Sequence, residues 1–229
     1  MVTGEFPRGV ADAQGARAVV HDRRGTLVAL DPRTGRVAWR AGRGLRPCAL
    51  VAGTVVAVRI DAPGEPGEPL VVVLLDADDG VQRWASEPLA LPPWARPALH
   101  DTDAFTLDAE PGHDQVVLRW TARSGYRGGA APGPDRVAAA THEARGAVRV
   151  DLRGPPSVTP LPEPPPAPET GEGPPSAVRV GDLTVELAVR PDPSGVAVVL
   201  RGTRPPADTP VWEVVLDEAP PPRAPPLRP

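Results

Sequence analysis

The chain has 229 residues, and its 25 basic and 29 acidic side chains give a formal net charge of −4. A slightly acidic chain without a basic cluster is poorly suited to bind nucleic-acid phosphates, so we expect no nucleic-acid partner. The sequence has no run of about 18 apolar residues, so it predicts no membrane span.

The N-terminal residues 1–7 have neither the basic region nor the apolar region of a signal peptide. The expected location is therefore the cytoplasm, and the alternative is a fragment of an exported protein. Every basic side chain other than histidine is arginine, and asparagine does not occur, which is typical of a bacterial genome rich in G and C. Cys48 is the only cysteine, which excludes an intrachain disulfide.

Three short β-prone segments open the chain, at residues 18–21, 27–30 and 37–39. A tight turn separates the second and third, where Asp31 can accept hydrogen bonds from the backbone and Gly35 can adopt the left-handed conformation. These signals predict an antiparallel sheet.

The same turn recurs 45 residues later, and a fainter copy follows after another 45. A period of roughly 40–50 residues is typical of propeller blades with four strands each. The three copies are Asp31, Gly35 and Trp39, then Asp76, Gly80 and Trp84, and finally Trp120 to Ser124 with Gly125 in the glycine position.

The first copy, Ala29-x-Asp31-x-x-Thr34-Gly35-x-x-x-Trp39, resembles the tryptophan-docking repeat of the pyrroloquinoline-quinone-like (PQQ-like) β-propeller family. The second copy has Leu74 and Asp79 in place of the alanine and threonine, and the third has Gly129 in place of the tryptophan. The resemblance covers residues 16–86. It implies that the tryptophan of one blade packs against the turn of a neighbouring blade.

Further strands are predicted along the rest of the chain. They are 48–51, 54–60, 70–75, a hairpin of 104–108 with 115–120, a hairpin of 136–140 with 147–151, and then 177–180, 184–189, 196–200 and 211–216. Ten of the 22 residues from Pro155 to Ser176 are proline, which predicts an extended or disordered excursion.

The predicted organisation has propeller blades over residues 1–153, a Pro-rich loop or linker over 154–176, the remaining strands over 177–217 and a disordered tail over 218–229. The predicted fold is all-β, a small or incomplete β-propeller of about four to five antiparallel four-stranded blades. A closed ring of five and an open ring of four both fit. An open ring would expose sheet edges, which favours self-association.

Candidate metal ligands come from four histidines that each precede an acid: His21, His100, His113 and His142. The densest group is His100, Asp101 and Asp103, which is a weak candidate for a metal site. A site needs several ligands that converge at about 2.0–2.2 Å. Solvated turn residues are the simpler interpretation.

The resemblance also implies a quinone held with calcium by acidic and amide side chains. The chain has no asparagine, one cysteine and too few blades for that arrangement, so we expect no cofactor and no catalytic residues. Motifs of nucleophilic, phosphate-binding or zinc chemistry are also missing from the sequence.

Two loop aromatics, Trp94 and Tyr126, could anchor a partner, and Pro162 to Pro166 is either an extended ligand or a passive spacer. The favoured hypothesis is a protein-binding or scaffold module without catalytic activity. One alternative is a metal-dependent enzyme or small-ligand-binding propeller that uses loop acids and histidines at the channel mouth. Another is a partial propeller completed by another chain.

Overall fold

The computed structural model describes residues 5–12, 14–125, 142–162, 176–192, 195–207 and 209–219. These residues form strands and turns, arranged in four antiparallel sheets that we name A to D in chain order. Within this part of the chain, no helix is long and apolar enough to cross a membrane.

Sheet A contains β1 (Glu5–Phe6), β2 (Gly9–Ala11), β3 (Ala18–His21), β4 (Leu27–Leu30) and β5 (Val37–Ala41). Sheet B contains β6 (Leu45–Val51), β7 (Thr54–Ile60), β8 (Leu70–Asp76) and β9 (Gln82–Ala85). Sheet C contains β10 (Phe105–Pro111), β11 (Gln115–Ser124), β12 (His142–Asp151) and β13 (Ser157–Leu161). Sheet D contains β14 (Ala177–Val180), β15 (Leu183–Asp192), β16 (Gly195–Thr203) and β17 (Pro210–Ala219). Each sheet is a meander, because every strand pairs with the next one along the chain.

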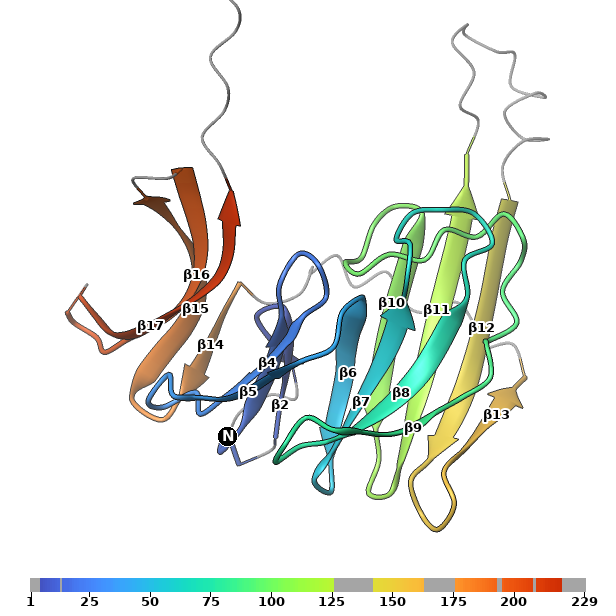
Figure 1. Cartoon of the computed structure of the whole chain (residues 1–229), viewed down its shortest axis with the longest axis horizontal. Coiled ribbons are helices and arrows are strands. Elements are labelled where there is room, and N and C mark those ends of the chain that lie inside the picture. Colours follow the sequence, from blue (N-terminus) through green and yellow to red (C-terminus); the bar gives the residue numbers. More distant parts are fainter. Residues whose placement is uncertain are drawn as a thin grey trace, which may run out of the picture.

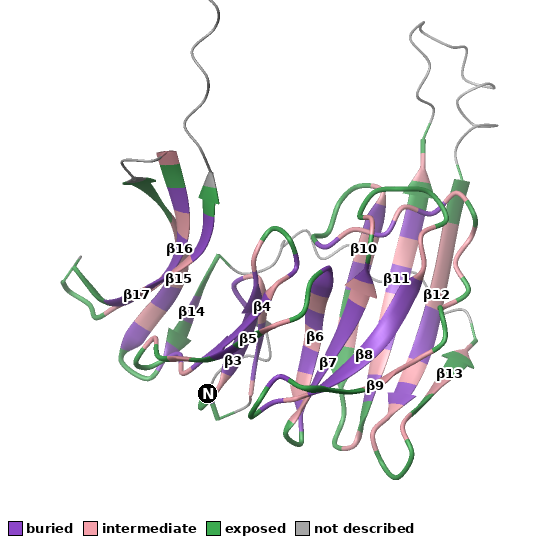
Figure 2. Ribbon diagram, in the orientation of Figure 1, coloured by how far each residue is buried: buried purple, intermediate pink, exposed green. Residues whose placement is uncertain are grey.

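The sheets stand side by side in the order D, A, B, C, with sheets D and C at opposite ends of the molecule (Figure 1). A separate apolar core fills each junction: one between D and A, one between A and B, and one between B and C. Strand β8 is buried on both faces from Leu70 to Leu75, because sheet B lies between two neighbours (Figure 2). The fold is therefore an incomplete β-propeller of four blades, which is one of the two arrangements that the sequence allows.

Both ends of this arc present charged faces. On the face of sheet C that points away from sheet B, Arg119 pairs with Glu110 at 2.7 Å. On the face of sheet D that points away from sheet A, Arg201 pairs with Glu186 at 2.7 Å. Arrays of stacked units need polar outer faces at their ends to stay soluble. These ion pairs make the outer faces of sheets C and D polar.

The third copy of the predicted turn is wrong. Trp120 to Ser124 continue strand β11, which pairs with β10 on one side and β12 on the other. A segment hydrogen-bonded along both edges cannot turn, and Gly125 simply follows the strand as an exposed residue.

Two further predictions for sheet C need correction. Residues 147–151 pair with β11 on one side and with β13 on the other. Neither edge of this segment is free for the predicted hairpin with 136–140, which lies outside the described residues. The Pro-rich loop or linker that is expected over 154–176 contains strand β13. Pro160 is tolerated there because β13 is an edge strand, where a missing N–H need not break the ladder.

Candidate functional site

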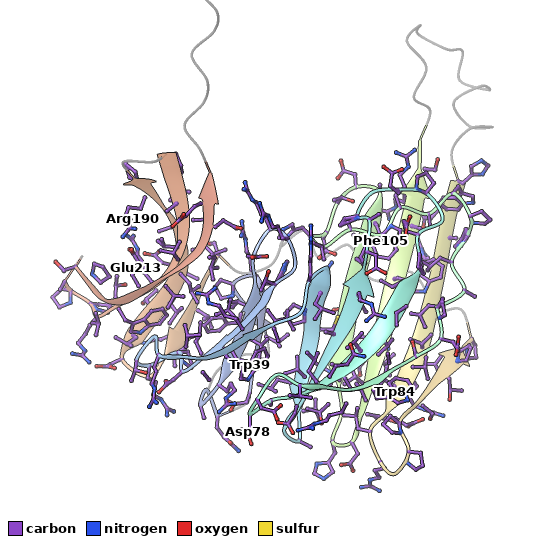
Figure 3. The ribbon with its side chains drawn as sticks, in the orientation of Figure 1. Trp39, Asp78, Trp84, Phe105, Arg190 and Glu213 are labelled. Atoms are coloured by element: carbon purple, nitrogen blue, oxygen red, sulfur yellow. The ribbon has the colours of Figure 1, made fainter. Side chains whose placement is uncertain are left out.

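The junction between sheets A and B is closed by Trp39, which reaches from β5 to the β8–β9 turn (Figure 3). Its Nε1–H donates to the carbonyl oxygen of Ala77 at 2.9 Å, and the side chain is 9 % exposed. The ring lies so close to Gly80 that an added Cβ would stand 2.6 Å from it. The Asp78 N–H donates to the Asp76 carboxylate at 2.8 Å, and this bond, with Arg83, holds the pKa of Asp76 below its usual value.

The junction between sheets D and A repeats this contact. Trp212 on β17 lies over Gly35, where an added Cβ would again stand 2.6 Å from the ring. Here the indole Nε1–H is buried without a hydrogen-bond partner. Arg8 of sheet A forms an ion pair with the buried Asp217 of sheet D across the same junction, at 2.5 Å.

Trp212 was missed by the sequence analysis. The loop before it, residues 204–209, contains no glycine, so no copy of the turn marks it. Its signal lies instead across the sheet, where Gly202 on β16 faces the indole ring.

The junction between sheets B and C has the tryptophan but a different receiving turn. Trp84 is only partly buried and lies beside the β12–β13 turn. In that turn Gly154 follows Asp151 by three residues, whereas Gly35 and Gly80 follow their aspartates by four. An added Cβ on Gly154 would meet nothing within 4 Å.

A cavity of about 270 Å³ opens beside Trp84 at this junction. Its lining consists of Gly53, Thr54, Leu74, Leu75, Asp76, Arg83, Trp84, Leu152 and Pro156. The lining is mainly apolar, and the Arg83–Asp76 ion pair, at 3.2 Å, adds charge.

No corresponding contact can join sheet C to sheet D. Val158 follows Gly154 by four residues, in the place where Trp39 follows Gly35. The β16–β17 loop of sheet D has no glycine to receive a ring. Both halves of the tryptophan–glycine pair are therefore missing at the two ends of the arc.

A second cluster lies around His21, where sheet A approaches the connection from sheet B to sheet C. His21 is 3 % exposed, and its ring stacks on that of His100 with the centroids 4.8 Å apart. Burial lowers the pKa of His21 to about 3, with further lowering from His100 and two nearby arginines. The expectation of a solvated turn residue is wrong at His21, which is a neutral, buried side chain at pH 7.

Asp101 belongs to the same cluster and is held by Arg46. The guanidinium donates to both carboxylate oxygens, at 2.8 and 3.0 Å, and the Leu107 N–H donates to one of them at 2.9 Å. His100 stacks on His21, while Asp103 is exposed. Within the described residues, no three side chains of His, Cys, Asp or Glu are grouped so that they could hold a metal ion.

The remaining candidates lie apart from this cluster. His113 and His142 are exposed, and Trp94 is partly buried with its ring 5.7 Å from that of His142. Burial raises the pKa of the Cys48 thiol to about 11, so it is protonated at neutral pH. Tyr126 and the segment 163–166 lie outside the described residues.

Comparisons with known proteins identify no family. The sequence matches no protein-family model, and no curated protein matches it significantly. Among solved structures, the chain is similar to BamB from Moraxella catarrhalis, with a TM-score of 0.38 and 16 % sequence identity over 94 % of this chain and 77 % of that one. A similarity of this size carries no functional argument.

Proposed function

We propose that this protein is a non-catalytic binding module that docks other proteins through the free part of sheet D. The observation that carries the proposal is an apolar surface on that sheet, the sheet D strip, formed by Val189, Pro191, Val196 and Val198. Val189 is 71 % exposed and Val196 is 39 % exposed, although both belong to the sheet face that elsewhere packs on sheet A.

The strip is uncovered because the two sheets differ in length. Strand β15 has 10 residues, whereas β3 and β4 of sheet A have 4 each. The first half of β15 therefore contributes Leu183 and Val185 to the D–A core, while the second half extends past it. Figure 2 shows the end of β15 and the start of β16 as less buried than the middle of these strands.

Contiguous exposed apolar side chains on a sheet face are typical of protein interaction sites. The Arg190–Glu213 ion pair lies on the opposite face of the same sheet and makes that face charged. The charged pairs around His21 have a different role, because Arg8–Asp217 and Arg46–Asp101 each join separate parts of the chain. We therefore assign that cluster to stability rather than to chemistry.

The test compares two surface valines. Val189→Asp places a charge in the strip, whereas Val81→Asp places the same charge on a residue of the β8–β9 turn that is 47 % exposed. Proteins captured by the wild type should be lost with Val189→Asp and kept with Val81→Asp. The same captured set with both variants would refute a docking role for sheet D.

The alternative of a propeller completed by another chain predicts association through the ends of the arc. The missing tryptophan–glycine pair and the ion pairs on the outer faces of sheets C and D argue against closure of the ring by apolar contacts there. Light scattering separates the hypotheses: association that Glu110→Arg abolishes, and Val189→Asp does not, would favour completion by another chain.

A further inference from the structure

We propose that the cavity beside Trp84 is a binding site for one planar aromatic group, of the size and chemistry of a tryptophan side chain. The site lies at the B–C junction, at a distance from sheet D, and the inference does not depend on the sheet D strip (Figure 3).

The first argument is the comparison of three equivalent junctions in one chain. At the D–A and A–B junctions, the indole is over nine-tenths buried because a glycine of the receiving turn lies directly against it. At the B–C junction the turn is one residue shorter between its aspartate and glycine, and Gly154 contacts nothing where a Cβ would be. Trp84 consequently borders a cavity, whereas each of its counterparts contacts a glycine.

The size of that space sets the class of ligand. A cavity of about 270 Å³ is larger than the roughly 150 Å³ that accommodates benzene in an engineered protein core. It is below the roughly 300–1,000 Å³ that is typical of sites for drug-sized molecules. One ring system fits between these limits.

The lining favours an aromatic group over an aliphatic one. Trp84 offers a π face, and aromatic rings prefer offset or edge-to-face contact with another ring. Arg83 lines the same cavity, with its guanidinium paired to Asp76 and Asp79, and a cation near a ring face is attracted to it. Thr54 is also in the lining, and a threonine hydroxyl can accept the N–H of an indole.

The test uses N-acetyl-tryptophanamide as the probe and N-acetyl-leucinamide as the aliphatic control. Binding is followed by NMR through the Trp84 indole N–H signal, assigned by its loss in Trp84→Phe. A group of this size binds with a dissociation constant on the order of millimolar. We expect the aromatic probe to shift the signal with at least a fivefold lower dissociation constant than the aliphatic one.

Two variants connect the shift to the cavity. Leu152→Trp fills it and should weaken probe binding at least tenfold, whereas Val211→Trp adds the same side chain to an exposed position of sheet D and should leave binding unchanged. If Leu152→Trp does not fold, Arg83→Leu removes the cation and should weaken binding several-fold. No saturable shift in the wild type, or equal binding after the cavity is filled, would overturn the proposal and identify the space as a packing defect.

Free indole as a third probe separates the two sources of such a group. Saturable binding by both indole and N-acetyl-tryptophanamide supports a polypeptide side chain as the natural ligand. Binding by indole alone supports the aromatic site but indicates a small molecule.

Discussion

The A–B and B–C junctions use the same indole in the same strand position, yet only the first is closed. Trp39 is 9 % exposed and hydrogen-bonded to Ala77, whereas Trp84 is partly exposed beside a cavity. The difference lies in the receiving turn, where the glycine follows the aspartate by three residues in sheet C and by four in sheet B. Closure of a junction therefore depends more on the glycine turn that receives the ring than on the tryptophan.

The largest loss of unfolding free energy is expected from replacing Gly80, the glycine that lies against the Trp39 ring. Gly80→Ala places a Cβ 2.6 Å from the Trp39 ring at a residue with φ of 72°. Left-handed strain and overpacking together should cost about 3 kcal/mol of unfolding free energy, measured by urea denaturation. Gly53→Ala is the matched control, because its φ is 76° but nothing lies within 4 Å, so only the strain of about 1–2 kcal/mol should appear. Equal losses in the two variants would show that the ring contact is unimportant.

Acid should weaken the molecule through His21. Its pKa falls from 6.5 to about 3 on folding, so the folded state binds the proton less readily than the unfolded state. The stabilisation is complete above pH 6.5 and is lost as the pH falls towards 3, at a slope of up to about 1.4 kcal/mol per pH unit. Denaturation midpoints between pH 7 and 4 measure this slope.

His21→Asn is the comparison for the acid effect, because it removes the titrating group. The variant should lose that slope, whatever its stability at pH 7. An unchanged slope would show that His21 does not carry the acid sensitivity.

The hydrogen bond of Trp39 can be tested against its counterpart in sheet B. Trp39→Phe removes one of the two donors to the Ala77 carbonyl, the other being the Arg17 guanidinium, and should cost about 2 kcal/mol from the lost bond and the smaller ring. Trp84→Phe removes a ring that is only partly buried and should cost less than about 1 kcal/mol. A Trp84 loss as large as that of Trp39 would mean that the B–C junction is as tight as the A–B junction.

The sequence predicts the fold well where local signals are complete. The strands at 18–21, 27–30, 54–60 and 177–180 have those bounds in the structure, because each is a short β-prone segment rich in apolar residues with turn residues at its ends. The fixed 45-residue frame misplaces the third turn, which occurs at Asp151 and Gly154 after two 10-residue strands, β11 and β12.

The candidate site was less predictable. Sequence alone shows His21 and His100 as separate residues beside acids, and their stacking depends on a contact between β3 and the connection that leaves sheet B. The cavity is also a tertiary feature, since it arises from a contact that fails to form. Only the spacing of Asp151 and Gly154 hints at it.

The smallest effect is expected from lengthening the aspartate–glycine spacing in the β12–β13 turn. Inserting a serine between Arg153 and Gly154 gives sheet C the aspartate–glycine spacing of sheets A and B. If that spacing is what closes a junction, the glycine should move under Trp84, and burying the rest of the ring should raise the unfolding free energy by about 1 kcal/mol. Quenching of Trp84 fluorescence by acrylamide should fall at the same time. The same insertion into the β14–β15 turn, between Gly181 and Asp182, controls for loop length and should stabilise nothing. A repaired turn that leaves both stability and quenching unchanged would place the cause in the β12–β13 backbone rather than in the turn.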